Sequence, residues 1–190
     1  MKQVFALVSL FLFIAACNNP AQQTQANRYY DVAGYIQRQI DTLAQRKPTV
    51  IKRLLVEGQV NQKRVDDINW IKELELFLQA DINKPAYRNS YLISKPDSLT
   101  VQYKLKAGEK LPVHALTVVL DSLYQKPSRI EALLVTDNPL YQSERRLLLE
   151  SSVSPDQKWQ LNHYRIDGFQ QLTFFDRKDF SVEGRVLSRQ

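Results

Sequence analysis

The chain of 190 residues is poor in the residues that build several common kinds of site. Its single cysteine, Cys17, excludes an intramolecular disulfide and a thiolate pair for zinc or an iron–sulfur cluster. Its five glycines are too scattered for a phosphate-binding loop or a nucleophile elbow. Its two histidines, His114 and His163, fall in different predicted strands with no second ligand at helical spacing. We therefore expect no metal and no cofactor.

Charge is only mildly in excess of one sign. The 26 Lys and Arg against 20 Asp and Glu give a formal net charge of +6, and no basic run is longer than two residues. Without a concentrated basic patch we expect no nucleic-acid partner, and an anionic membrane surface is the more natural one. A plainer alternative is that the dispersed cations are simply solubilising side chains. These include Arg38, Lys52, Arg53, Arg145 and Arg146.

The one long hydrophobic run lies at the amino terminus. Lys2 precedes an apolar stretch from Val4 to Ala16 that only Ser9 interrupts. As a helix this stretch would span roughly 20 Å, against about 30 Å for the hydrocarbon core of a bilayer, so a permanent membrane span is not expected. The pattern predicts a cleaved secretory signal peptide over residues 1–16.

The end of this run, Ile14-Ala15-Ala16-Cys17, resembles the lipobox of bacterial lipoproteins. The resemblance implies that the Cys17 sulfur is diacylated, that the bond before it is cut, and that the new amino terminus receives a further acyl chain. Two or three chains anchor a protein firmly, since each buried methylene contributes about 0.8 kcal/mol. The alternatives are an ordinary signal peptide with an incidental cysteine, or a buried membrane anchor. Beyond the motif, the chain resembles uncharacterised envelope lipoproteins. This resemblance implies no particular activity.

Residues 17–28 carry almost no charge and little apolar bulk before Arg28, and we expect a flexible tether behind the lipidated cysteine. In some bacteria an Asp after that cysteine retains a lipoprotein in the inner membrane, but this chain has Asn18. We therefore expect an outer-membrane protein. The lack of acidic residues in the tether favours the periplasm-facing leaflet, with the cell surface and the inner membrane as alternatives.

Residues 29–190 are expected to form a single α+β domain: an antiparallel β meander of about 7–9 strands, as a curved sheet or partial barrel, with two amphipathic helices. Apolar residues at helical spacing predict helices near Arg28–Arg46 and Asp67–Ala80, the second capped by Asp66 or Asp67. After Pro85 the hydrophobic period changes from 3.6 to 2. The candidate strand segments are Thr49–Val56, Gln59–Val65, Ser90–Ser94, Leu99–Leu105, Val113–Asp121, Arg129–Thr136, Tyr141–Ser151, Lys158–Ile166, Phe169–Phe175 and Phe180–Leu187.

The sharpest local motif is Asp167-Gly168 between two alternating runs, which favours a two-residue type I′ hairpin. Such a turn would place large apolar side chains on both faces of the sheet and would require a covering layer on each. One face would carry Tyr164, Ile166, Phe169 and Phe175, and the other Trp159, Leu161, Leu172 and Phe174.

The sequence favours a lipid-anchored, non-enzymatic envelope protein that binds a hydrophobic ligand or an envelope partner. The candidate ligand-binding aromatics are Tyr164, Phe169, Trp159 and Phe174. No catalytic residue is assigned, because the carboxylates that lie close to one another in the sequence are explained as a helix cap or as a solvated helix edge. A lipid-anchored hydrolase with a dispersed active site and a structural or assembly scaffold of the outer membrane are the alternatives.

Overall fold

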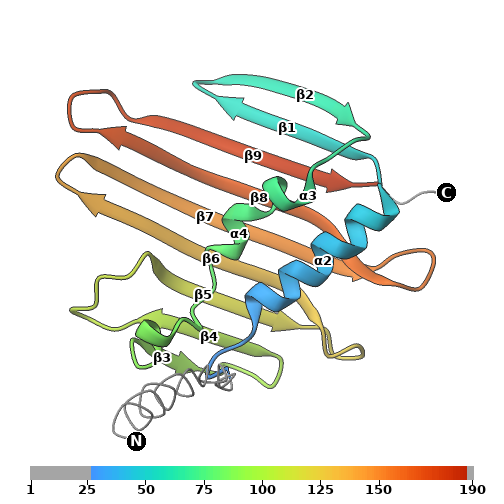
Figure 1. Cartoon of the computed structure of the whole chain (residues 1–190), viewed down its shortest axis with the longest axis horizontal. Coiled ribbons are helices and arrows are strands. Elements are labelled where there is room, and N and C mark those ends of the chain that lie inside the picture. Colours follow the sequence, from blue (N-terminus) through green and yellow to red (C-terminus); the bar gives the residue numbers. More distant parts are fainter. Residues whose placement is uncertain (1–26, 188–190) are drawn as a thin grey trace, which may run out of the picture.

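The computed structural model describes residues 27–187 (Figure 1). Its strands are β1 (Val50–Val56), β2 (Gln59–Val65), β3 (Tyr91–Ser94), β4 (Thr100–Leu105), β5 (Val113–Leu120), β6 (Pro127–Asn138), β7 (Tyr141–Val153), β8 (Trp159–Leu172) and β9 (Lys178–Val186). Its helices are α2 (Val32–Arg46), α3 (Trp70–Glu73), α4 (Glu75–Leu78) and the short 3-10 helix η2 (Pro85–Tyr87).

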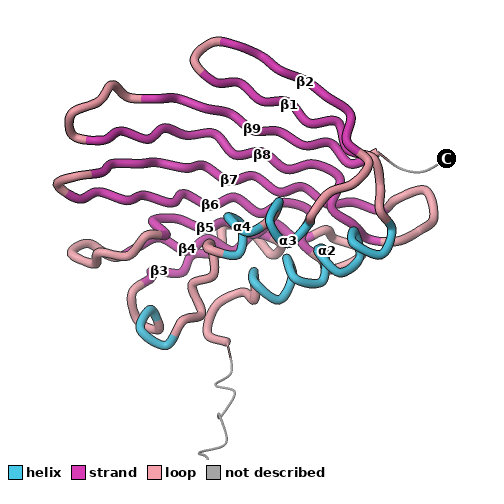
Figure 2. Tube along the Cα trace, turned by 45° about the horizontal axis from the view of Figure 1, so that its top comes forward, coloured by secondary structure: helices cyan, strands magenta, loops and turns pink. Residues whose placement is uncertain are grey.

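Within the described range the nine strands form one antiparallel sheet in the order β2-β1-β9-β8-β7-β6-β5-β4-β3. The sheet is open, because its edge strands β2 and β3 do not pair with each other. The chain passes between these edges through α3, α4 and η2, which lie with α2 over one face of the sheet (Figures 1 and 2). This confirms the predicted α+β class and antiparallel meander. We call this face the helix-bearing face and the opposite one the polar face.

Helix α2 forms where its apolar period predicts. The Asp31 side chain caps its first turn by accepting a hydrogen bond from the backbone N–H of Gly34, and Lys47 ends it in the left-handed conformation. The side chains at helical spacing, Val32, Ile36, Ile40 and Leu43 among them, are buried against the sheet.

The second predicted helix is broken into α3 and α4, with the break at Leu74, whose ψ of 7° departs from helical geometry. Its cap is Asn69, which accepts from the N–H of Lys72, and not the predicted Asp66 or Asp67. Asp66 instead accepts a hydrogen bond from the Thr49 hydroxyl at the end of the β1–β2 hairpin. The two short helices still bury Trp70, Leu74 and Phe77, as the apolar pattern predicts.

The start of the described chain is fastened beside η2, β3 and β4 by tyrosines. The Tyr29 hydroxyl donates to the backbone carbonyls of Tyr87 and Arg88, and its ring packs edge-on against Tyr91 and Tyr103. Tyr103 of β4 is 5% exposed, and Val101 and Leu105 of the same strand are partly buried against the core. The position of the amino-terminal end relative to the sheet is therefore fixed.

The predicted Asp167-Gly168 hairpin is wrong. Strand β8 runs straight through both residues, Asp167 pairing with Arg146 and Gly168 with Arg145 on β7. Gly168 does not adopt a positive φ. It is required for another reason: a Cβ there would lie 2.1 Å from the backbone carbonyl oxygen of Glu144. The glycine therefore marks a close approach of two strands, and the chain reverses later, at residues 173–177.

The residues predicted to share each face of the sheet are also wrong, partly because β8 continues through Asp167 and Gly168. A bulge in β8 is the second reason. The register between β7 and β8 shifts at Glu150 and Ser151, which leaves Asn162 as an extra residue in β8. The bulge places both Leu161 and Tyr164 in the core, although alternation alone would separate them. The apolar residues thus gather on the helix-bearing face, and the predicted second covering layer is not found within residues 27–187.

Candidate functional site

The polar face carries a repeated charge pattern. Six Arg–carboxylate ion pairs join residues two apart in the chain, the spacing that puts both side chains on one face of a strand. The pairs are Arg64 with Asp66, Arg129 with Glu131, Glu144 with Arg146, Arg165 with Asp167, Arg177 with Asp179, and Glu183 with Arg185. Such i,i+2 pairs were visible in the sequence, and they are the pattern by which this face could have been recognised as solvent-facing.

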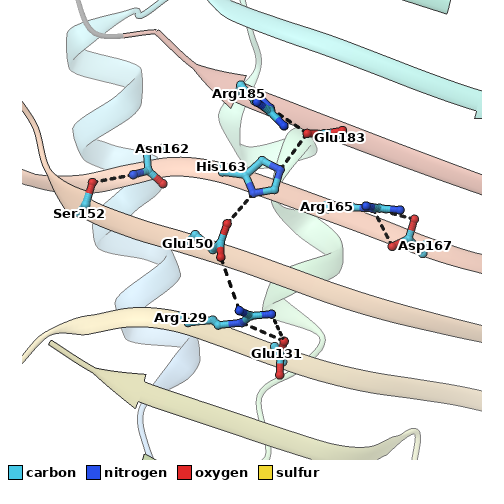
Figure 3. A network of polar contacts seen from close by, with 10 residues as sticks. All are labelled: Arg129, Glu131, Glu150, Ser152, Asn162, His163, Arg165, Asp167, Glu183 and Arg185. Carbon is cyan, nitrogen blue, oxygen red and sulfur yellow. Dashed lines mark hydrogen bonds and ion pairs between the residues drawn. The ribbon is translucent and has the colours of Figure 1, made fainter. Parts of the chain in front are cut away.

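His163 connects these pairs across three strands (Figure 3). Its Nδ1 lies 2.7 Å from Glu150 on β7, and its Nε2 lies 3.1 Å from Glu183 on β9. Glu183 also accepts from Arg185 at 2.9 Å, and Glu150 lies 3.8 Å from Arg129 on β6. As alternation predicts, His163 and the buried Tyr164 point to opposite faces.

This network does not have the form of a catalytic site. Both ring nitrogens of His163 face carboxylates, so neither is directed at a substrate position. The two carboxylates in turn are held by cations, Glu150 by Arg129 and Glu183 by Arg185. The arrangement therefore fits a cross-strand ladder that fixes the register of β6 to β9.

The ladder should make the free energy of unfolding depend on pH in the acidic range. Hydrogen bonds from Arg185 and His163 hold the pKa of Glu183 below its ordinary value of 4.5. Because the unfolded chain binds this proton more readily, the folded state should lose stability as pH falls through 4.5 and below. We expect Glu183→Gln to show a smaller further loss than wild type in urea melts between about pH 6 and about pH 3. Glu109→Gln is the control, and an unchanged acid slope for Glu183→Gln would contradict the assignment.

On the helix-bearing face the strand centres are covered by helices. Tyr164 is fully buried and donates from its hydroxyl to Glu73 on α3 at 2.5 Å, while Lys52 contacts the other oxygen of Glu73 at 2.8 Å. Burial, and then the Glu73 carboxylate, raise the pKa of Tyr164. The Trp159 indole N–H donates to the Tyr35 hydroxyl of α2 at 3.2 Å. Two of the four predicted ligand aromatics, Tyr164 and Trp159, are thus engaged with the helices.

Beyond the helices the same face is open at the ends of β1, β7, β8 and β9, where the strand ends project past α3 and α4 (Figure 1). Register places Val56, Phe180 and Gly168 side by side there, in the row next to Leu54, Val182 and Ile166. We call this region the open apolar end. Its exposed apolar members are Leu54 at 43%, Val56 at 38%, Leu172 at 50% and Phe175 at 67% exposure.

A pocket of about 400 Å³ lies at this end. It is lined by Tyr141, Gln170, Gln171, Leu172, Phe175, Asp176 and Lys178. Two cations border the open apolar end: Lys178 pairs with Glu57 at 2.8 Å, and Arg145 donates to the Tyr141 hydroxyl at 3.0 Å. Apolar surface beside a guanidinium suits a molecule with an aliphatic part and an anionic group.

The four predicted ligand aromatics do not come together. Tyr164 and Trp159 pack beneath the helices, whereas Phe169 lies on the polar face under the Arg177 guanidinium, 3.7 Å from its ring centre. Phe174 is 89% exposed in the turn between β8 and β9, beside the open apolar end. Sequence reasoning missed Leu54, Val56 and Phe180, because the pairing of β1 with β9 joins residues distant in the chain. Cys17 lies outside the described residues.

Among residues 27–187 no helix combines the length and hydropathy needed to cross a bilayer. In the same range no three His, Cys, Asp or Glu side chains gather in a way that could hold a metal ion. Comparison with known proteins gives no match: no protein family, no curated protein and no solved structure matches this chain.

Proposed function

We propose that this chain is a non-enzymatic lipoprotein of the bacterial envelope, anchored through acyl chains on Cys17, that binds an acyl-chain amphiphile at its open apolar end. The proposed location is the outer membrane, on the periplasm-facing leaflet. The lipobox-like Ile14-Ala15-Ala16-Cys17 supports the anchor. The exposed apolar surface described above carries the ligand proposal.

The contrast between the ends of the helix-bearing face supports a binding role. Under the helices its apolar side chains are almost completely buried, as Leu149 at 1% and Leu161 at 0% exposure illustrate. Past the helices Leu172 and Phe175 are half exposed or more, on a face whose chemistry is that of a core. Exposed apolar side chains gathered at one end of a sheet face are typical of an interaction site in folded proteins.

The charges around this surface favour an amphiphile over a purely apolar ligand. Arg145 lies on the helix-bearing face opposite Gly168 and is partly exposed. Its hydrogen bond to Tyr141 is to a neutral hydroxyl, so its charge remains available to an anionic head group. The neighbouring leucine, valine and phenylalanine side chains would contact the aliphatic part.

One experiment tests the ligand. Protein released from its own membrane in mild detergent is denatured and extracted, and both phases are analysed by mass spectrometry. Covalent acyl chains remain on the polypeptide, whereas a bound amphiphile is released. We expect a released acyl lipid from wild type, reduced about tenfold or more in a Leu172→Ser/Phe175→Ser chain, because the two changes remove apolar contact area.

The matched control is Ile71→Ser/Leu123→Ser, which alters two side chains of 64% and 80% exposure away from the open apolar end. Both double variants should melt close to wild type, since exposed substitutions cost little stability. Equal release from wild type and the Leu172→Ser/Phe175→Ser chain would refute the ligand site. A protein retained by wild type and lost from that variant would support the scaffold alternative instead.

A further inference from the structure

The edge of the sheet formed by η2, β3, β4 and the β4–β5 loop is unusually basic. Residues 81–112 hold six Lys and Arg against three Asp and Glu, a net of +3, while residues 27–187 as a whole hold 24 against 20, a net of +4. Most of the excess charge of the described chain is therefore in this segment. We call it the basic edge.

The cations of the basic edge differ from those of the polar face in their pairing. The arginines of the ladder each lie against a carboxylate two residues away, as Arg165 does with Asp167 at 2.8 Å. Within the described residues, Lys95, Lys104 and Lys110 are exposed and have no such ion pair. Among the acids of the segment, Asp97 is engaged by the backbone N–H groups of Leu99 and Thr100. With six cations against three carboxylates, the basic edge keeps a net charge of +3.

The basic edge also has features that suit contact with lipid head groups. The edge strand β3 exposes Leu92 at 57% and Ile93 at 47%. The β4–β5 loop borders an open pocket of about 580 Å³ whose charged lining residues are Lys104, Lys106 and Glu109. Exposed aliphatic side chains among lysines, next to a pocket that two lysines line, match an interface of phosphates and glycerol carbons.

The described chain begins at this same edge. Arg28 donates to the Asn89 side chain at 2.6 Å, and Lys106 donates to the Asn89 backbone carbonyl at 2.6 Å. Residues 1–26, which include Cys17, therefore join the domain at the end of the basic edge that holds Asn89 and Lys106. An anchor on Cys17 would bring the basic edge, rather than the far edge at β2, to the membrane.

We infer that the basic edge lies against the anionic phospholipid head groups of the membrane that carries the anchor. The inference rests on the proposed anchor, which would bring the chain to that membrane. Charge and topology indicate which edge of the sheet faces it. The sheet then stands edge-on, with β3 at the bilayer and β2 farthest from it. The attraction between the lysines of the basic edge and an anionic surface should be strong at low ionic strength and should be screened by salt.

The test is lysine acetylation footprinting of the full, membrane-derived protein on vesicles of phosphatidylcholine alone or with roughly one third phosphatidylglycerol. Lys95, Lys104 and Lys110 report on the edge, and the exposed Lys63, Lys72 and Lys126 are controls in the same molecule. We expect the edge lysines to react about fivefold or more slowly on the anionic vesicles, and the difference to vanish in about 0.5 M salt. The control lysines should react equally on both.

A triple variant separates charge from simple proximity. In a chain with Lys95→Gln, Lys104→Gln and Lys110→Gln, protection of Lys84 and Lys106 should be lost, whereas the same change at Lys63, Lys72 and Lys126 should keep it. Equal reactivity on neutral and anionic vesicles, with the protein sedimenting on both, would overturn the inference and leave the anchor intact. Failure to sediment on neutral vesicles, with edge protection on anionic ones, would refute the anchor and support the basic edge.

Discussion

Replacing Gly184 with alanine should destabilise the chain by about 3 kcal/mol and lower its melting temperature by about 10 °C. Gly184 lies on β9 between Tyr164 of β8 and Lys52 of β1, on the helix-bearing face. A Cβ there would lie 2.1 Å from the Tyr164 ring. That ring is fully buried and packs edge-on against Phe77, and its hydroxyl donates a hydrogen bond to Glu73. It therefore has no space into which to move.

A double-mutant cycle identifies the cause. Tyr164→Leu alone should also destabilise, because it leaves a cavity and removes the hydrogen bond to Glu73. Combined with Gly184→Ala, the loss should be smaller than the sum of the two by about 1 kcal/mol or more, since leucine frees the space that the new methyl group needs. Additive losses in urea melts would show that Gly184 matters for another reason.

Gly108→Ala is the control for backbone effects. Gly108 has a φ of +87°, and nothing lies within 4 Å of the position that its Cβ would take. This substitution should cost only about 1 kcal/mol, the strain of a left-handed alanine. A cost for Gly184→Ala no greater than that of Gly108→Ala would contradict the packing explanation.

The hydrophobic period was enough to predict helix α2 and most strands of the sheet. Alternation located β4 through Tyr103 and Leu105, and helical spacing located α2 through Ile36 and Ile40, because each element buries one face. The predicted strands Thr49–Val56 and Gln59–Val65 leave only Glu57 and Gly58 between them, and the chain reverses there, where the φ of Gly58 is +80°. These features depend on residues close together in the chain.

The failures in the sheet involve contacts between strands. Asp167-Gly168 is a strong local turn motif, yet Gly168 serves the approach of Glu144 from β7, and the real turn holds Phe174 and Phe175. The Asn162 bulge reverses which side chains share a face, and no local pattern predicts its position. Local propensity was overridden here by the pairing of a long strand on both sides.

The candidate site could be predicted only as a type of surface. The sequence predicts abundant aromatics on sheet faces, but which of them are covered depends on where α2, α3 and α4 lie. Trp159 is covered because Tyr35 of α2 lies over it, while Phe175 remains open because the strands extend past the helices. Exposure of an apolar residue is thus a property of the layers and cannot be derived from strand period alone.

On the proposed lipid anchor, replacing Cys17 with serine should abolish firm membrane attachment. Serine provides no thiol for acylation. The loss of two proposed acyl chains would remove an apolar contribution of about 0.8 kcal/mol for each buried methylene. In fractionated cells we expect wild type in the detergent-soluble membrane fraction. The Cys17→Ser chain should either be released or keep an uncleaved signal peptide.

The mass of the purified protein decides between these states. Wild type should begin at Cys17 and carry acyl chains, and an Asn19→Ser chain, altered two residues away, should keep the same modification and the same fraction. Attachment of the Cys17→Ser chain through the basic edge alone should be removed by about 0.5 M salt, whereas acyl anchoring resists it. A cleaved, unmodified wild-type chain that begins at any other residue would show that the Ile14-Ala15-Ala16-Cys17 motif does not direct lipidation.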